Sequence, residues 1–203
     1  AHASTGAGGT WSSQLQSTLT SVIGAANYDI GHLFGASGGG GNAGCIGCVC
    51  VNNSKGSGFT SPADNIPQGD NFDIDYVVHE VGHQLGANHT FSHSNEGYGV
   101  NKEVGSGITI MGYAWITSYD VSPHSIEFCH QSSVAQIQAN LLTKTCPVTT
   151  SIAGNNATPV VNGVSNFTIP ISTPFALTGS ASDADGDPLT YSWEQNDNTT
   201  TTG

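Results

Sequence analysis

The eleven residues from His79 to His89 constrain this chain more than any other stretch, and they read HEVGHQLGANH. His79 and His83 are four positions apart, so on a helix they lie one turn apart on the same face. Gly86 can adopt the left-handed conformation that ends a helix, after which the reversing chain can return His89 toward the other two rings. A helix, a sharp turn and a returning loop are therefore predicted here.

Three imidazoles and a carboxylate at these spacings suit a catalytic zinc ion. His79, His83 and His89 supply three ligands, which leaves one tetrahedral position for water, as in catalytic rather than structural zinc sites. Glu80 lies about 100° round the helix axis from His79, where it can hold a water without ligating. It is the candidate general base. The alternative is a helix whose histidines only line a polar cleft.

The sequence before the motif predicts the extent of the helix. We expect it to run from about Asp73, as N-cap, to Leu85. Apolar residues recur at helical spacing on the side opposite the histidines, and we expect this stripe to face the core: Ile74, Val78, Val81 and Leu85.

The motif resembles that of a known clan. His-Glu-x-x-His-x-x-Gly-x-x-His is the zinc signature of the metzincin metalloproteases. Met111, within Thr109-Ile-Met-Gly-Tyr113, is similar to the methionine turn of that clan. The resemblance implies that Met111 is a packing platform beneath the ligands. Tyr113 matches a tyrosine of astacin-like and serralysin-like members. Three roles stay open for it: a ligand that the zinc gains or loses, a hydrogen-bond donor to the transition state, or part of the wall of the site.

Over about residues 15–146 the chain looks most like reprolysin-like (M12B-like) secreted proteases of bacteria. The resemblance is carried by four stretches: Tyr28–Phe34, Gly38–Gly41, Phe72–Tyr76 and Asn88–Phe91. Thr90 replaces the aspartate of snake-venom and ADAM-type relatives, which leaves the subfamily open.

The resemblance implies an α+β, zincin-like catalytic domain over residues 1–148. It would hold a twisted sheet, the active-site helix, the Met-turn and a C-terminal helix. Such domains usually open with a strand, a long helix and a strand, whereas this chain begins at the second helix. We therefore expect an abbreviated variant or a removed N-terminal fragment or propeptide.

Hydrophobic periodicity locates the remaining elements. It predicts helices over residues 12–23 and over residues 132–142, the second capped by Ser132. Strands are expected at residues 30–34 and 45–51, and a loop at 52–71. Substrate could extend along an edge strand such as residues 30–34, where His32 is either a strand histidine or a cleft neighbour.

Charge excludes some partners. Lys plus Arg number 3 against 15 Asp plus Glu, for a formal charge of −12. Nucleic acid and anionic membranes require basic patches, so neither is an expected partner. No run approaches the roughly 18 apolar residues of a membrane-spanning helix. The N-terminus lacks the regions of a signal peptide, so we expect a secreted, trimmed product.

Five cysteines stand at positions 45, 48, 50, 129 and 146. Cys129 and Cys146 bracket a predicted helix, and we expect a disulfide between them. Two of Cys45, Cys48 and Cys50 can form a second pair, although their pairing is open. One thiol is left over within the chain.

The character of the sequence changes after Pro147. Residues 149–156 are linker-like, and residues 157–203 are expected to be an incomplete immunoglobulin- or PKD-like β segment, with strands at 167–171, 175–177 and 189–193. Asp183, Asp185 and Asp187 resemble the calcium loops of PKD-like and cadherin-like repeats. A solvated acidic turn is the alternative, whereas Pro188 argues against an EF-hand.

Together these features predict a secreted zinc endopeptidase that acts on protein or peptide substrates, with Zn²⁺ as cofactor and Ca²⁺ as a second candidate ion. Two alternatives remain. One is a non-catalytic extracellular binding or adhesin module built on a degenerate protease domain. The other is a hydrolase that applies the same zinc chemistry to a non-protein amide.

Overall fold

The computed structural model describes residues 10–152 and 154–199, which form two compact units. Unit 1 comprises residues up to 147 together with those from 194 onward, and unit 2 comprises residues 148–193. Helices and strands are mixed in unit 1, in agreement with the predicted α+β class. Within the described ranges, no helix has the length and apolar character needed to span a membrane.

Unit 1 is built on a small three-stranded sheet of order β1-β3-β2. β1 (His32–Phe34) runs parallel to the central β3 (Gly58–Ser61), and β2 (Gly40–Asn42) runs antiparallel to it. β1 lies in the predicted strand at 30–34. By contrast, β3 occupies the segment expected to be a loop and β2 lies in the glycine run, because neither carries the apolar alternation that marks a strand in sequence.

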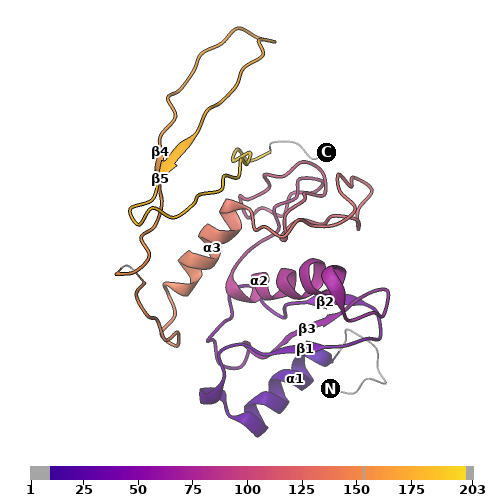
Figure 1. The fold of residues 1–203 in the computed structure, drawn as a ribbon. Coiled ribbons are helices and arrows are strands. Elements are labelled where there is room, and N and C mark those ends of the chain that lie inside the picture. Colours follow the sequence, from indigo (N-terminus) through magenta and orange to yellow (C-terminus); the bar gives the residue numbers. More distant parts are fainter. Residues whose placement is uncertain (1–9, 153, 200–203) are drawn as a thin grey trace. The chain divides into compact units, whose positions relative to one another are not determined.

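Helices cover the sheet on both faces (Figure 1). On one side lies α1 (Trp11–Thr18), continued by η2 (Leu19–Ile23) and followed by η3 (Ala25–Asn27). Trp11 is buried and its ring meets that of Phe59 on β3 edge-on, at 5.5 Å between centroids. The helix predicted over residues 12–23 is thus present, with a wider-turned second half.

On the other side of the sheet, η4 (Asn71–Val78) runs directly into α2 (His79–Leu85). The helix begins before the expected position, so Asp73 lies exposed in its first turn and is not the N-cap. η4 is a π-helix, whose i→i+5 hydrogen bonds place more residues in each turn. The stripe predicted at 3.6-residue spacing is therefore kept only in part: Ile74 packs against the core as expected, whereas Val78 is exposed.

The polar side chain of Gln84 joins α2 to the sheet. It is fully buried, donates to the carbonyl of Gly31 at 3.1 Å, and its Oε1 lies 2.7 Å from His32 Nδ1. The other ring nitrogen of His32 lies 2.7 Å from the hydroxyl of Thr60. His32 is therefore a fully partnered strand residue. A glutamine in this role carries no hydrophobic signal, so the pattern could not reveal it.

Residues 45–51, predicted to be a buried strand, instead form turns around the C-terminal end of α2. The backbone N–H of Gly47 donates to the carbonyl of His83 at 2.8 Å, and that of Val49 donates to Gln84 at 3.1 Å. These bonds satisfy carbonyls that a helix end leaves without intrahelical donors. The turns thus fix the end of the helix that carries His83.

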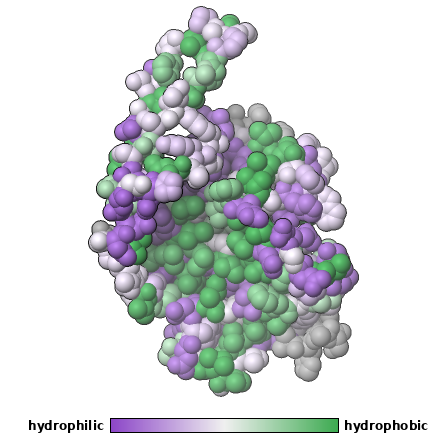
Figure 2. Space-filling view, viewed as in Figure 1, coloured by the Kyte–Doolittle hydropathy of each residue, from purple (hydrophilic) through white to green (hydrophobic). Residues whose placement is uncertain are grey.

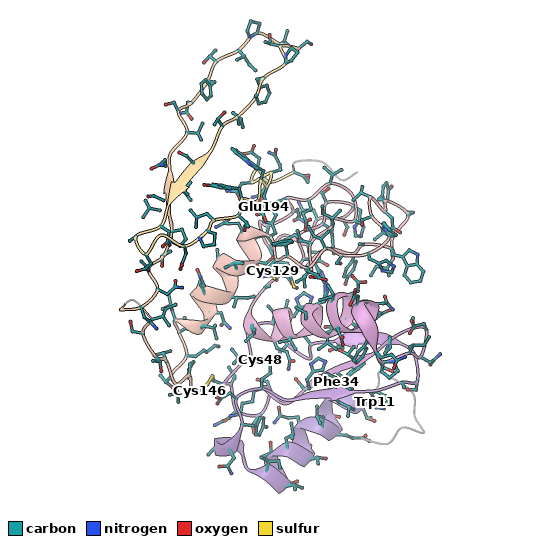
Figure 3. The ribbon with its side chains drawn as sticks, viewed as in Figure 1. Trp11, Phe34, Cys48, Cys129, Cys146 and Glu194 are labelled. Atoms are coloured by element: carbon teal, nitrogen blue, oxygen red, sulfur yellow. A yellow bond between two sulfur atoms is a disulfide. The ribbon has the colours of Figure 1, made fainter. Side chains whose placement is uncertain are left out.

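Disulfides join Cys45 to Cys48 and Cys50 to Cys146, so the predicted Cys129–Cys146 bond is wrong. Cys129 and Cys146 lie at opposite ends of α3 (Gln131–Leu141; Figure 3). A helix of 11 residues is about 16 Å long, which far exceeds the ~7 Å that a disulfide can span between Cα atoms. Bracketing a helix therefore argues against pairing rather than for it.

α3 is capped by His130 and not by the expected Ser132. The imidazole Nδ1 of His130 accepts from the backbone N–H of Ser132 at 3.1 Å. Glu194 Oε2 in turn accepts from the N–H of Gln131 at 2.7 Å. Histidine is not among the common cap residues, which explains why the pattern favoured serine.

Unit 2 contains one antiparallel pair, β4 (Val160–Asn162) with β5 (Ser180–Ser182). The segments 167–171, 175–177 and 189–193 are not strands. Hydrophobic side chains along this unit stay exposed (Figure 2), and they include Phe167, Phe175 and Trp193. Strand propensity alone did not turn the three predicted segments into strands, because a strand needs partners to pair with and a face to bury.

The calcium prediction receives no support. Asp183, Asp185 and Asp187 do not form a ligand cluster in the described part of the chain. The Asp183 carboxylate instead accepts from the backbone N–H of Asp185 at 2.8 Å, and Asp185 accepts from the N–H of Ala157. The carboxylates are thus used singly in a turn, as in the solvated acidic turn that was the alternative.

The disulfide pattern yields a stability prediction. We expect Cys146→Ser to lower the free energy of unfolding by about 2–5 kcal/mol, because the Cys50–Cys146 bond closes a long loop. The matched variant Cys48→Ser removes the Cys45–Cys48 bond, which closes a loop of sequence separation 3. It should lower the free energy of unfolding by less than Cys146→Ser does. Urea titration of the oxidised variants measures both. A Cys129–Cys146 peptide in the digest of the wild type would contradict the pairing.

Candidate metal centre

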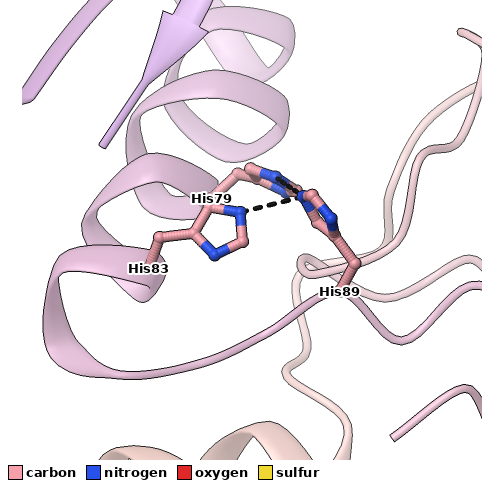
Figure 4. A group of neighbouring side chains, drawn as sticks. All are labelled: His79, His83 and His89. Carbon is pink, nitrogen blue, oxygen red and sulfur yellow. Dashed lines mark hydrogen bonds between the residues drawn. The ribbon is translucent and has the colours of Figure 1, made fainter. Parts of the chain in front are cut away.

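His79, His83 and His89 converge on one point, as the sequence predicted (Figure 4). The Nε2 atom of His89 lies 3.2 Å from that of His79 and 2.9 Å from that of His83. α2 presents the first two rings. Gly86, at φ 125°, ends the helix as expected, and the chain then returns His89 toward them.

The opposite nitrogen of each ring faces a fixed acceptor. His79 Nδ1 lies 2.6 Å from the carbonyl of Ile110, and His83 Nδ1 lies 2.7 Å from the carbonyl of Ala87. His89 Nδ1 lies 2.9 Å from the Glu96 carboxylate. A carbonyl or carboxylate accepts and does not donate, so the proton sits on Nδ1 in all three rings. Three Nε2 lone pairs therefore point at one another.

Burial keeps these rings neutral. Desolvation, together with the neighbouring imidazoles of His83 and His89, lowers the pKa of His79 to about 3. The pKa of His89 is lowered to about 3 for the same reasons, with His83 and His93 as neighbours. Burial also lowers the pKa of His83. Three unprotonated nitrogens thus stay available to a cation at neutral pH.

This donor set fits zinc. Tetrahedral zinc with Zn–N bonds of about 2.0–2.1 Å places its ligand nitrogens about 3.3–3.4 Å apart, close to the spacing here. A carbonyl or carboxylate behind each ring is the usual outer shell of histidine ligands. Lone pairs that face each other without a proton between them repel, so a cation between the three nitrogens would stabilise the arrangement.

Glu96 belongs to this outer shell, although it lies outside the motif. It stands seven residues after His89 and meets the ring across the loop between them. Desolvation raises the pKa of its carboxyl, whereas the facing histidines lower it. No signal in the sequence pointed to this residue. A loop brings Glu96 to His89, so the two are not separated by the regular spacing of a helix or strand.

Met111 is fully buried in a small core with Ala87 and Ile110, against which Cys129 also packs. It lies beside the active-site helix at Gly82, where an added Cβ would stand 2.6 Å from the methionine sulfur. Only a residue without a side chain allows this approach. Gly82 thus lets Met111 pack directly against the backbone of α2.

Glu103 ties the segment that follows His89 to the Met111 segment. Its carboxylate accepts from the hydroxyls of Thr90 and Thr109, and from the backbone N–H groups of Ile108 and Thr109 at 2.9 Å each. Thr90 follows His89, and Thr109 comes two residues before Met111. The threonine that departs from the aspartate of relatives thus has a carboxylate partner elsewhere in the chain.

Glu80 lies on the boundary of two cavities that flank the histidines. Burial raises the pKa of its carboxyl to about 7, and the backbone N–H of Ala43 opposes that shift by donating to the carboxylate. Gly41 on β2 lies so close that an added Cβ would stand 2.3 Å from Glu80 Oε1. The edge strand beside the site is therefore β2, not the predicted segment 30–34.

Tyr113 lies among the histidine rings, 4.4 Å from His89 and 5.6 Å from His79 between ring centroids. Burial, together with the nearby carboxylates of Glu80 and Glu96, raises the pKa of its hydroxyl to about 12. The phenol therefore remains a hydrogen-bond donor at neutral pH. It lines both cavities.

We expect Glu96→Gln to weaken zinc binding by about 10- to 100-fold, because outer-shell partners orient the ligand ring and raise its basicity. Competition with a chromophoric chelator measures the affinity. Asp64→Asn is the control, since Asp64 is an exposed acid outside both cavities and its replacement gives the same loss of charge. Equal affinity in Glu96→Gln and wild type would refute this role.

Comparison with known proteins adds one positive finding. Residues 1–141 match the family model of reprolysin-like metallopeptidases of family M12B. No curated protein and no solved structure gave a match.

Proposed function

The chain belongs to the reprolysin-like M12B metallopeptidase family, and on that premise we propose that it is a secreted zinc-dependent endopeptidase. The observation that carries the proposal is the convergence of three neutral imidazole nitrogens beside a carboxylate. The two disulfides support secretion, because such bonds persist mainly in oxidising, extracellular compartments.

His79, His83 and His89 would hold the zinc ion, which when bound supplies Lewis acidity toward a water molecule and a carbonyl oxygen. Met111 is proposed as the packing platform beneath these ligands. Its burial against Gly82 supports that role, since it restricts the movement of the helix that carries two of them.

Glu80 acts as the general base in this proposal. Its carboxylate takes a proton from the attacking water and passes it to the nitrogen of the leaving amine. A pKa of about 7 suits a group that must both accept and release a proton near neutral pH, and an adjacent dication would lower this value. The hydrogen bond from Ala43 holds the carboxylate in place.

Tyr113 is proposed as a hydrogen-bond donor to the oxygen that becomes negatively charged in the transition state. Its hydroxyl keeps its proton, since its pKa is raised to about 12. A preorganised donor of this kind stabilises charge that develops during the reaction.

The substrate chain would extend along β2. This strand pairs with β3 on one side only, and its residues line both cavities. An extended peptide can add to such an edge through backbone hydrogen bonds. A peptide bound there would place one of its bonds beside Glu80, because Gly41 and Glu80 are in contact.

We expect Glu80→Gln to lower kcat by about 100- to 10,000-fold while zinc stays bound, because the amide retains the shape of the side chain but cannot accept a proton. Cleavage of a fluorogenic peptide and metal analysis on the same samples measure the two effects. A chelator should abolish wild-type activity and added zinc should restore it. Normal turnover in the variant would refute the assigned base.

We expect Gly41→Ala to lower kcat about a hundredfold with unchanged zinc content, because the new methyl group displaces Glu80 and small misplacements of a catalytic group are costly. Gly163→Ala is the control, since an added Cβ there meets nothing within 4 Å. Equal rates for the Gly41→Ala variant and the control would show that the contact with β2 does not position the base.

A further inference from the structure

The first of the two cavities beside the histidines contains a carboxylate that the proposed mechanism does not use. The cavity has a volume of about 330 Å³ and extends from Glu80 and His79 to Asp75. Asp75 lies one turn before His79 on η4. Its side chain is 15% exposed, so it is largely enclosed but open to whatever enters the cavity.

The Asp75 carboxylate has spare acceptor capacity. Oδ1 accepts from the backbone N–H of Ser125 at 2.9 Å, and Oδ2 lies 3.2 Å from His124 Nδ1. A carboxylate offers about four lone-pair sites, so these contacts occupy only part of it. His124 is itself 59% exposed. The remaining lone pairs can accept from an incoming ammonium or guanidinium group.

The rest of the wall is largely uncharged. Apolar surface of this cavity comes from Tyr76, Ala114, Trp115 and Ile116. Such a wall suits a side chain with a long hydrocarbon stem and a charged head, which buries its stem and keeps its charge with a partner. An aromatic ring near the head can add cation–π attraction.

His124 can pair with this carboxylate when protonated, but no lysine is among the residues that line the cavity. The chain has three lysines and no arginine. Lys55 donates to the carbonyl of Ala25, Lys102 to Asn196 and Lys144 to the carbonyl of Gly47. The second cavity likewise contains Glu80 and Glu96 and no lysine.

From this arrangement we propose that Asp75 selects a lysine or arginine side chain at the substrate residue that fills the first cavity. The inference rests on the proposed peptidase function and assigns its substrate class, namely peptides with a basic residue next to the cleaved bond. An aliphatic side chain would strip water from the Asp75 carboxylate without replacing its hydrogen bonds, which is unfavourable.

If Asp75 only linked η4 to the segment at Ser125, its replacement would affect substrate preference differently. Asp75→Asn keeps a side-chain oxygen that can accept from Ser125, so a mere link would leave substrate preference unchanged. Selection by charge would be lost in that variant. Asp73→Asn is the matched control, because Asp73 is exposed two residues earlier on η4 and does not line the cavity.

Two measurements on the zinc-loaded full chain test the proposal. The first is the dissociation constant, by calorimetry, of two amino-acid hydroxamates that differ only in carrying an arginine or a norleucine side chain. The second is the ratio of kcat/KM for peptides with arginine or norleucine next to the cleaved bond. We expect arginine to be favoured about 10- to 100-fold in both, as for one charge-assisted hydrogen-bonded pair. Asp75→Asn should bring both ratios to near one, and Asp73→Asn should leave them unchanged.

Equal binding of the two hydroxamates by the wild type, or an unchanged ratio in Asp75→Asn, would overturn the selection. The two hypotheses fail separately. Hydroxamate binding that favours arginine without cleavage of any peptide would support selection of a cation by Asp75 and contradict the peptidase function. Peptide cleavage that favours norleucine would support the peptidase function and contradict the selection of a basic residue.

Discussion

The site depends on the direction of three imidazole protons. Each ring of His79, His83 and His89 has an acceptor behind Nδ1, and this places its lone pair at Nε2, facing the other two. The acceptors come from three separate segments: the one that contains Met111, the helix end at Ala87 and the loop at Glu96. The chain must therefore fold around all three rings before the nitrogens converge, which links the metal centre to the fold of unit 1.

Much of unit 1 holds the end of α2 in place. The turns at residues 45–51 donate to its last carbonyls, and Asn140 on α3 donates to the carbonyl of Leu85 at 2.7 Å. The Cys50–Cys146 disulfide ties those turns to the chain that follows α3. These bonds restrain the helix terminus where the chain leaves toward His89. A rigid terminus is what a third ligand needs, because the ligand lies beyond the helix that positions the other two.

The sequence predicted the elements that follow from local periodicity and from the zinc motif. The helices, the first strand, the turn at Gly86 and the meeting of the three histidines agree with the structure. Contacts that depend on tertiary packing could not be predicted from the sequence. Gln84 joins helix to sheet through a polar group, and Glu96 reaches His89 across a loop, so neither has a periodic signal.

The errors share a physical cause. A strand was expected at residues 45–51 because the segment is apolar, yet its backbone N–H groups bond to the end of α2. Cys129 and Cys146 were expected to pair because they bracket a helix, yet the length of that helix keeps them apart, and Cys146 pairs with Cys50. In unit 2, β-prone segments without strand partners remained unpaired. In each case the conformation that a segment adopts depends on the hydrogen-bonding and packing partners that the fold places beside it, and not only on its own sequence.

X-ray absorption at the zinc K-edge of the zinc-loaded chain tests the central claim most directly. We expect one zinc per chain with three imidazole nitrogens at about 2.0–2.1 Å and one further light-atom ligand. Sulfur in the coordination shell, fewer than three imidazoles, or zinc bound at well below one ion per chain would contradict it.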